Sequence, residues 1–256
     1  YAVKANPSPW VLEALWSGGI RHFDVASLNE IIQVRSQFTD AILAFMHPVK
    51  NRNAIHKAYF EHGCRIFSID SDAELNKVLA ATDNAKDLTL MIRLSVSNSS
   101  ASLPLDNKFG VSEQDAIELL RRARSVTRED LGICFHVGSQ CMDPSAYVAA
   151  MDLAKNIIHK ASVVIDIIDV GGGFPVNYRG MTPPDMSLYM AAIAEKFETM
   201  PVLENCELWC EPGRALVAEA TSIITRVELR KGNVLFINDG AYGNLFDATH
   251  VRWPFE

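Results

Sequence analysis

The segment VVIDIIDVGGG (163–173) is a run of β-branched apolar residues, interrupted by two aspartates and closed by three glycines. Such a run predicts a buried strand, and the glycines predict a tight turn where the strand ends. Seven further segments are apolar and rich in β-forming residues. We expect strands there too, over residues 1–5, 22–26, 41–46, 65–69, 88–94, 132–137 and 207–211.

Helix-like segments separate most of these expected strands. Their apolar residues recur at helical spacing, and Ser71 with Glu74 forms a capping box at the start of one of them. We expect helices over residues 8–16, 71–79, 112–124, 144–160 and 188–197. Strands that alternate with helices predict a parallel α/β sheet, and eight such units fit a (β/α)8 TIM-like barrel of about 200–250 residues. The alternative is an open doubly wound sheet, but no G-x-G-x-x-G follows the first strand.

The pattern changes near residue 216. The stretches AEATSIITRVEL (218–229) and NVLFIND (233–239) predict consecutive strands without a helix between them. We therefore expect a cofactor-binding barrel over residues 1–215 and the truncated beginning of a β-rich C-terminal domain over residues 216–256. Because a strand is expected at residue 1 and no helix cap or tail closes the sequence, we expect these 256 residues to be part of a longer chain.

Composition and charge narrow the class of protein. The 256 residues are 48% hydrophobic and 21% charged, which is typical of a globular protein with one large core. The formal net charge of -7 and the lack of a basic cluster argue against nucleic acid as a partner. No apolar run reaches membrane-spanning length. The five cysteines are odd in number and irregularly spaced, so we expect a cytoplasmic protein with reduced thiols and no metal site.

Polar residues interrupt the expected strands near their C-terminal ends, where barrel enzymes carry their chemistry. They are Lys4, Asp24, Arg93, His136, Asp169 and Glu211, each on a different strand. Two interpretations of Lys4 stay open from the residues alone. It is either an edge-strand lysine in water, or an amine in a dry site whose lowered pKa makes it a nucleophile. Likewise, His136 could be a core histidine and Glu211 a buried ion-pair partner, but six polar residues at one end of successive strands favour a common site.

Two glycine-containing loops predict a site for an anion. GGG (171–173) follows one expected strand and PGR (212–214) follows the next, while Gly138 and Ser139 come directly after the strand of His136. Glycines let backbone N–H groups approach an anion closely, and this is the usual phosphate position in a barrel. The alternative is a tight strand exit without a ligand. An amine, an imidazole, a carboxylate and a phosphate cradle together match the needs of pyridoxal 5'-phosphate.

With these residues assembled, the chain resembles the ornithine-decarboxylase-like family of pyridoxal-phosphate decarboxylases, which have the alanine-racemase-like fold. The matching stretches run through the chain in family order: YAVKAN (1–6), HFDVASLNEI (22–31), RIFSID (65–70), NKFGV (107–111), CFHVGSQ (134–140), DVGGGFP (169–175), EPGR (211–214) and NDGAYGNLFD (238–247). HVGSQ, GGGFP and EPGR, each after an expected strand, are highly specific in combination. The resemblance therefore implies a pyridoxal-phosphate-dependent carboxy-lyase.

The resemblance also implies a role for each candidate site residue. Lys4 is implied to carry the cofactor covalently, Glu211 to keep the pyridine nitrogen protonated, and His136 to stack on the ring. Asp24 and Arg93 are implied to lie near the cofactor. The residues implied to surround the phosphate are Gly138, Ser139, Gly171, Gly172, Gly173, Gly213 and Arg214.

Three further positions follow from the resemblance. Glu30 is a pocket candidate, Asp247 matches an acid that binds the distal amine of a basic substrate, and Lys108 matches a lysine that makes a salt bridge across a homodimer with shared active sites. In one respect the sequence departs from the family pattern. The family's later second domain supplies a cysteine, an acid and a phosphate-contacting tyrosine, and none of them has a match here. Either that remainder is absent from this sequence, or the protein is a shortened, inactive relative.

The substrate is expected to be a basic L-amino acid. GGGFP and LFD resemble ornithine or lysine/ornithine decarboxylases more than diaminopimelate decarboxylases, so we expect L-ornithine to be converted to putrescine for polyamine biosynthesis, with lysine next. Two other functions remain as alternatives. One is a non-catalytic homologue that acts as a binding or regulatory protein; the other is a racemase, in which an arginine would replace Glu211 as the partner of the ring nitrogen.

Overall fold

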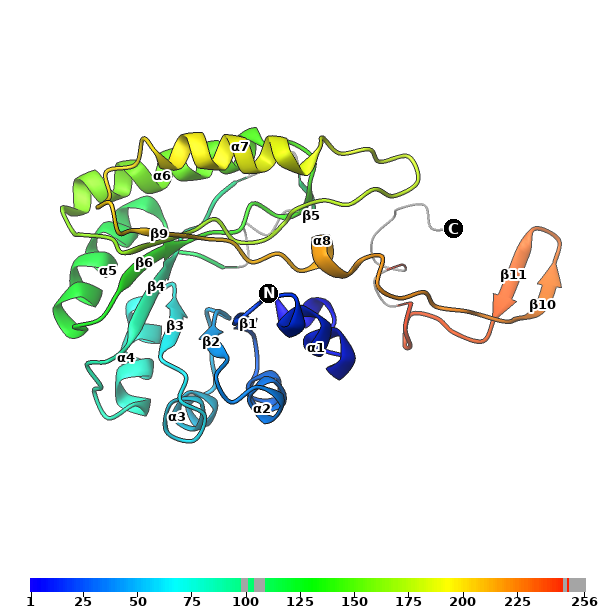
Figure 1. Ribbon diagram of the computed structural model, residues 1–256, viewed down its shortest axis with the longest axis horizontal. Helices are drawn as coiled ribbons and strands as arrows, with labels where there is room; N and C mark the ends of the chain where they lie inside the picture. Colours follow the sequence, from blue (N-terminus) through cyan, green and yellow to red (C-terminus); the bar gives the residue numbers. More distant parts are fainter. Residues whose placement is uncertain (98–100, 104–108, 246–247, 249–256) are drawn as a thin grey trace.

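The computed structural model describes residues 1–97, 101–103, 109–245 and 248. At its centre is a curved sheet of seven parallel strands in the order β1-β2-β3-β4-β6-β8-β9 (Figure 1). These strands are β1 (His22–Val25), β2 (Ile42–Phe45), β3 (Ile66–Ile69), β4 (Thr89–Arg93), β6 (Leu131–Cys134), β8 (Ile167–Asp169) and β9 (Glu207–Trp209). The prediction of an α/β fold built on a barrel-type parallel sheet is confirmed.

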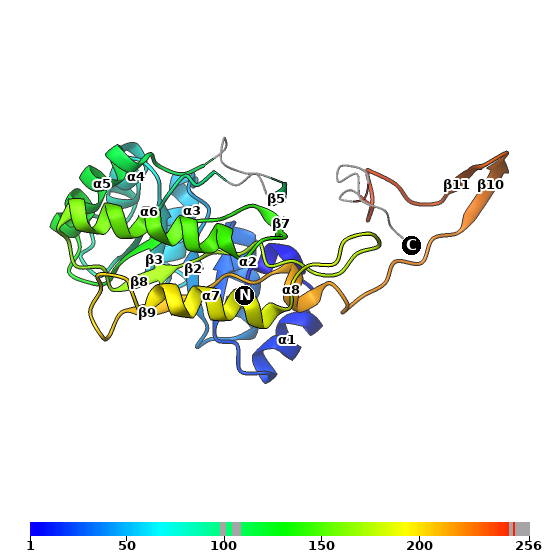
Figure 2. The same cartoon turned by 90° about the horizontal axis from the view of Figure 1, so that it is seen from above.

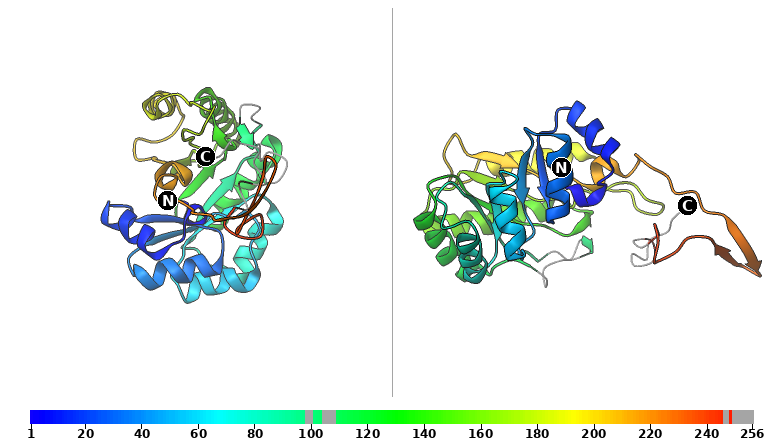
Figure 3. Two further views of the ribbon diagram at one scale, coloured as in Figure 1. Left: turned by 90° about the vertical axis from the view of Figure 1, so that its right-hand side faces the viewer. Right: turned by 90° about the horizontal axis from the view of Figure 1, so that it is seen from below.

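Helices surround this sheet on its outer side, as the left view of Figure 3 shows. They are α1 (Pro9–Ser17), α2 (Leu28–Gln37), α3 (Arg52–Phe60), α4 (Asp72–Ala81), α5 (Glu113–Val126), α6 (Ser145–Ala161) and α7 (Met186–Phe197). The short helix α8 (Arg214–Val217) lies at the end of the sheet, after β9 (Figure 3). Serine side chains cap three of them by accepting a hydrogen bond from a backbone N–H in the first turn. The buried residues of the longer helices pack against the strands in one apolar cluster, as expected for helices with one apolar stripe.

The capping box predicted at α4 is half formed. The Oγ of Ser71 accepts a hydrogen bond from the backbone N–H of Glu74 at 3.3 Å. The Glu74 carboxylate does not return this bond. It lies 3.0 Å from the Nζ of the buried Lys50 and 2.5 Å from the Nζ of Lys77. A buried lysine needs a carboxylate partner more than a helix end needs a second cap, so the ion pair determines where Glu74 points.

The ring of strands is completed by the first two residues. Ala2 forms a parallel bridge with Asp24 of β1, and its N–H donates to the Pro212 carbonyl after β9 at 3.2 Å. The strand expected over residues 1–5 is therefore wrong beyond Ala2. The Ala5 N–H bonds back to the Ala2 carbonyl at 3.1 Å, and residues Val3–Ala5 form the 3-10 helix η1. Lys4 is thereby carried on a turn at the rim of the sheet and not on a strand.

The core has two layers. Outside the sheet, apolar residues of the strands pack against the helices in one large cluster. Inside the curved sheet lies a smaller cluster, formed by Ala44, Met46, Ile66, Met91, Cys134 and Ile167, with Trp209 at its edge. Inward and outward side chains alternate along each strand, so both faces are buried and the strands read as continuous apolar runs.

A hairpin projects from the rest of the molecule (Figures 1 and 2). It consists of β10 (Val227–Lys231) and β11 (Val234–Ile237), which pair in antiparallel fashion and are exposed on both faces. The strand expected over 218–229 is thus confirmed only in its last residues, because residues 218–226 are not in a strand. The division into domains at residue 216 stays a prediction.

A second pair of short strands lies next to the sheet. β5 (Ala101–Leu103) and β7 (Ser139–Cys141) pair in antiparallel fashion, and neither was expected from the sequence. Within the described residues, no helix has the length and apolar character that a membrane span requires. The same residues contain no group of three or more His, Cys, Asp or Glu side chains placed to hold a metal ion.

Candidate active site

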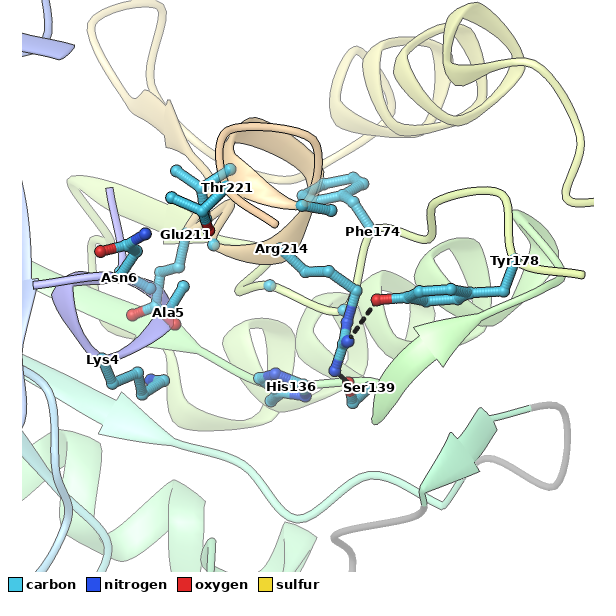
Figure 4. Close-up of a pocket in the computed structure, with 16 residues that line it drawn as sticks. Lys4, Ala5, Asn6, His136, Ser139, Phe174, Tyr178, Glu211, Arg214 and Thr221 are labelled. Carbon is cyan, nitrogen blue, oxygen red and sulfur yellow. Dashed lines mark hydrogen bonds between the residues drawn. The ribbon is translucent and has the colours of Figure 1, made fainter. Parts of the chain in front are cut away.

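A cavity of about 360 Å³ opens at the rim of the sheet where the strands end (Figure 4). Segments far apart in the sequence line it: η1, the loops after β6, β8 and β9, and α8. The charged or chemically active side chains among its lining residues are Lys4, His136, Ser139, Tyr178, Glu211 and Arg214. Of the six polar residues expected at strand ends, Lys4, His136 and Glu211 line this cavity together.

Lys4 enters this cavity from η1. Its Nζ donates a hydrogen bond to Asp24 Oδ2 at 3.0 Å, and its side chain is 56% exposed while that of Asp24 is 5% exposed. Burial lowers the pKa of the Lys4 amine, but the carboxylates of Asp24 and Glu211 outweigh it, so the pKa lies above the ordinary lysine value. Neither sequence-based interpretation of Lys4 holds in full: the residue faces a site, as the second required, but its pKa is raised and not lowered.

Three buried carboxyl groups close to Lys4 interact electrostatically with one another. Asp24 comes from β1, Asp169 ends β8 and Glu211 follows β9. Burial raises the pKa of Asp169 to about 6, although the N–H of Gly171 donates to its Oδ1 at 2.8 Å. Burial, together with the charges of Asp169 and Asp24, raises the pKa of Glu211 well above its usual range. Within the Asp169–Glu211 pair, a proton is therefore retained near neutral pH.

His136 is held as a neutral imidazole. The backbone N–H of Gly138 donates to its Nδ1 at 2.9 Å, so Nδ1 is an acceptor and the ring proton lies on Nε2. Burial lowers the pKa of His136 to about 3, and the positive charges of Arg93 and Lys4 add to the effect. The ring is therefore uncharged across the physiological pH range. In the view of Figure 4, it lies between Lys4 and the guanidinium of Arg214.

The loops after β6 and β8 fit together only because they contain glycines. Gly138 and Gly173 both have positive φ, 95° and 99°, a region that other residues rarely adopt. A Cβ on Gly173 would lie 2.3 Å from the Gly138 carbonyl oxygen. A Cβ on Gly172 would lie 2.7 Å from the Glu211 carbonyl oxygen, and one on Gly171 would lie 2.0 Å from that of Phe135. These contacts bring the three loops together at one end of the cavity.

Arg214 lies at that same end. Its Nη1 donates to the Tyr178 hydroxyl at 2.9 Å and its Nη2 donates to Ser139 Oγ at 3.3 Å. Gly213 precedes it, and a Cβ there would lie 2.9 Å from the Cβ of Ala5. A guanidinium beside a hydroxyl and glycine backbone forms a donor set that suits a phosphate group.

Other predicted residues lie beside the cavity or outside the described chain. Asp24 and Arg93 do not line it, although Asp24 holds Lys4, and the charge of Arg93 acts on His136 and Glu211. Glu30 does not line it either, because its Oε2 accepts a hydrogen bond from the Ala26 N–H at 2.6 Å at the start of α2. Asp247 and Lys108, assigned by resemblance to the substrate amine and the dimer contact, both lie outside the described residues.

Sequence reasoning missed Tyr178. This residue lies in the loop between β8 and α7, and it lines the cavity next to Arg214. Nothing in VNYRG (176–180) has strand or helix periodicity, so no pattern in the sequence links it to the site. Only the fold of the loop brings it there.

Comparison with known proteins gives consistent matches. The family model described as "Pyridoxal-dependent decarboxylase, pyridoxal binding domain" matches residues 1–218. A curated lysine/ornithine decarboxylase from Selenomonas ruminantium is 31% identical over 263 residues, which cover 100% of this chain and 65% of that protein. Antizyme inhibitor 2 from Xenopus laevis is 29% identical, covering 98% of this chain and 59% of that protein. The chain thus spans less than two thirds of the length of these curated relatives.

The fold also matches a solved structure. The solved structure of SrLDC in complex with PLP and cadaverine superimposes on this chain with a TM-score of 0.83, and the two sequences are 28% identical. The match covers 99% of this chain and 65% of the other chain. The similarity therefore extends over the sheet, the helices and the loops that form the cavity.

Proposed function

The chain belongs to the pyridoxal-dependent decarboxylase family, whose pyridoxal-binding domain it contains, and we propose that it decarboxylates a basic L-amino acid, with L-ornithine as its preferred substrate and putrescine as its product. One observation supports this most directly. Lys4, His136, Glu211 and Arg214 come from four separate segments of the chain and line one cavity. None of these residues alone indicates a cofactor site. An amine, a flat neutral ring, a protonated acid and a cation in one cavity do indicate one.

The residues of the cavity fit pyridoxal 5'-phosphate, the cofactor of the family. One end carries the Lys4 amine and the other carries Arg214, Ser139 and the glycine loops. Because a Cβ at Gly172 or Gly173 would run into backbone oxygen atoms, only glycine lets the loops approach this closely, and it leaves their backbone at the cavity wall uncovered by side chains. When bound, pyridoxal 5'-phosphate supplies an aldehyde that condenses with amines and a ring that withdraws electrons from the substrate's α-carbon.

Lys4 and Asp24 act as a pair in this proposal. A lysine amine must lose its proton before it attacks a carbonyl carbon. Asp24 Oδ2 lies 3.0 Å from the Lys4 Nζ and holds the amine at the cavity wall. The same contact raises the pKa of Lys4, so a negative charge that positions the amine also delays its deprotonation. We propose that Asp24 fixes the direction of the amine and stabilises its positive charge after each turnover.

Glu211 acts with Asp169 behind it. An acid that donates to a pyridine nitrogen must keep a proton at the pH of catalysis. Burial and the neighbouring carboxylates of Asp169 and Asp24 raise the pKa of Glu211, which achieves this. We propose that Glu211 would give this proton to the ring nitrogen of the bound cofactor and, as a carboxylate, would then pair with the charged nitrogen and keep it protonated.

His136 and Arg214 position the other parts of the ligand. The neutral imidazole of His136 offers a flat face without charge, which suits stacking against a pyridine ring. Arg214 and Ser139 bind the phosphate and hold the ligand in register with Lys4. We also propose a cytoplasmic homodimer with shared active sites, as the family resemblance implies; light scattering of the purified protein tests the dimer.

The choice of ornithine is the finest part of the proposal. Its support is the similarity to a lysine/ornithine decarboxylase and the GGGFP (171–175) and LFD (245–247) stretches. One methylene separates ornithine from lysine, which in a pocket is worth about 1–3 kcal/mol. The test is carbon dioxide release from L-ornithine, L-lysine, L-arginine and diaminopimelate, measured side by side. A higher kcat/KM for diaminopimelate than for ornithine would contradict the substrate assignment.

A non-catalytic binding protein is the second candidate function. The similarity to antizyme inhibitor 2 favours it, because that relative matches over 98% of this chain. The cavity argues for the enzyme, since Lys4, His136, Glu211 and Arg214 are all present in it. A protein that binds pyridoxal 5'-phosphate but releases no carbon dioxide from any of the four amino acids would support the second candidate.

A further inference from the structure

The guanidinium of Arg214 is held between two hydroxyl groups from different segments. Nη1 donates to the Tyr178 hydroxyl at 2.9 Å, and Nη2 donates to Ser139 Oγ at 3.3 Å (Figure 4). Ser139 begins β7, and Tyr178 comes from the loop between β8 and α7. Both hydroxyls are neutral, so these two contacts orient the guanidinium without cancelling its charge.

The loop that carries Tyr178 is fixed by its own hydrogen bonds. Tyr178 and Met181 exchange two backbone bonds, with N–O distances of 3.2 Å and 2.8 Å, around Gly180 at φ 76°. On the other side, the Val176 N–H donates to Gln140 Oε1 at 3.2 Å, which attaches the loop to β7. The ring of Tyr178 is therefore placed by a turn of defined geometry.

Tyr178 differs from the other tyrosines near the site. Tyr147 and Tyr189 are fully buried, and their hydroxyls donate to the backbone carbonyls of Gly172 and Cys141. Those contacts stabilise the fold. Tyr178 is half-buried, and it lines the cavity with its hydroxyl against Arg214.

We propose that Tyr178 is a further cofactor-binding residue, whose hydroxyl donates a hydrogen bond to the phosphate group of pyridoxal 5'-phosphate while it accepts one from Arg214. A phenol can accept and donate at the same time. A hydrogen bond received from a cation polarises the O–H group and makes it a stronger donor. The phosphate of the cofactor is an anion with several acceptor oxygens, and the end of the cavity with Arg214, Ser139 and the glycine loops is the one that suits it. The inference rests on the proposed function, because it assumes that the cavity binds this cofactor.

The test compares two ligands that differ only in the phosphate. Apo-protein is titrated with pyridoxal 5'-phosphate and with pyridoxal, and the dissociation constants are measured by absorbance and protein fluorescence. For Tyr178→Phe, we expect the affinity for pyridoxal 5'-phosphate to fall about tenfold, the usual cost of one hydrogen bond to a charged group. We expect the affinity for pyridoxal to change less than about twofold. Tyr59→Phe is the matched control, because its hydroxyl bonds to Asp87 on the surface and lies outside the cavity.

The outcomes separate this inference from the proposed function. If the wild-type protein binds the phosphorylated cofactor and Tyr178→Phe binds it equally well, the inference is overturned and the proposed function stands. If Tyr178→Phe loses as much affinity for pyridoxal as for the phosphorylated form, the hydroxyl supports the shape of the cavity through Arg214 and does not bind phosphate, which also overturns the inference. A wild-type protein that binds neither ligand contradicts the proposed function and the inference together.

Discussion

Asp24 and Lys4 meet at the rim of the barrel, with 3.0 Å between the carboxylate Oδ2 and the amine Nζ. The bridge between Ala2 and Asp24 sets this distance, because it places η1 directly over the end of β1. A charged pair at the site therefore follows from the way the first residues close the ring of strands.

We expect Asp24→Asn to lower the pKa of Lys4. Burial lowers that pKa, and the neighbouring carboxylates raise it by more. When one carboxylate is removed, the lowering by burial is compensated less, so the pKa falls. The neutral amine is then present at lower pH, so Lys4 in apo-protein reacts with an amine-selective reagent at lower pH than in the wild type. The measurement is the pH dependence of Lys4 labelling, followed by mass spectrometry.

The matched control for that experiment is Asp83→Asn. Asp83 is an exposed carboxylate in the turn after α4, and its positive φ of 53° suits asparagine equally well. It should leave the labelling profile of Lys4 unchanged. An Asp24→Asn profile identical to that of the wild type would show that Asp24 does not set the pKa of the amine.

We expect Asp169→Asn to stabilise the protein at neutral pH. The folded-state pKa of Asp169 is raised to about 6, above the unfolded value of about 3.9. The folded state therefore binds the proton more tightly, and its stability falls as pH rises from the unfolded pKa through the folded pKa. Asparagine removes this loss while keeping an oxygen that accepts from the Gly171 N–H. The expected gain at pH 7 is about 1–3 kcal/mol in the free energy of unfolding.

Urea unfolding of wild type and Asp169→Asn at pH 4, 5, 6 and 7 measures this effect. The difference between the two proteins should be small at pH 4 and should grow towards pH 7. Because Asp169 and Glu211 share their protons, the variant should also lower the pKa of Glu211 by removing the charge beside it. A variant that is less stable than the wild type at pH 7 would show that the Asp169 carboxylate stabilises the fold.

We expect Gly173→Ala to destabilise the protein and weaken cofactor binding. The alanine Cβ would lie 2.3 Å from the Gly138 carbonyl oxygen, and the φ of 99° is unfavourable for any side chain. The two loops must move apart, at a cost of about 2–4 kcal/mol in the free energy of unfolding. Gly180→Ala separates the two causes, because Gly180 also has a positive φ of 76°, but a Cβ there would meet no atom within 4 Å. Denaturant unfolding of both variants should show the larger loss for Gly173→Ala.

We expect Lys50→Met to destabilise the protein strongly. Lys50 and Glu74 are both 4% exposed, and the Nζ of Lys50 lies 3.0 Å from Glu74 Oε1. Without the lysine, the Glu74 carboxylate keeps only Lys77 as its cationic partner, and breaking a buried ion pair typically costs about 3–5 kcal/mol. The exposed pair Lys160–Glu113 is the control: Lys160→Met should change the free energy of unfolding by less than about 1 kcal/mol. Equal effects in the two variants would contradict this expectation.

Much of the fold follows from local pattern. The apolar runs and the helices between them predict the parallel sheet because each strand is buried on both faces and each helix has one apolar stripe. His136 and Glu211 were predicted at the site because they lie at the C-terminal ends of expected strands, and Arg214 because it lies in the loop that follows; such strand ends meet at one edge of a barrel. The glycines of the two loops were recognised for the same reason.

Other features depend on contacts between distant residues, and no local pattern contains them. The raised pKa of Lys4 requires Asp24 and Glu211 to be close in space. The partner of Glu74 is Lys50, which lies 24 residues earlier in the chain. Tyr178 reaches Arg214 only through the turn at Gly180. In each case, the sequence contains the residue, but the fold determines its partner.

The central claim is that Lys4 binds the aldehyde carbon of pyridoxal 5'-phosphate. The most direct measurement is borohydride reduction of the protein with its cofactor, followed by proteolysis and mass spectrometry of the peptides. We predict one phosphopyridoxyl adduct on the peptide that contains Lys4, and none in Lys4→Ala. An adduct on Lys50 or another lysine in the wild-type protein, or no adduct at all, would contradict the account.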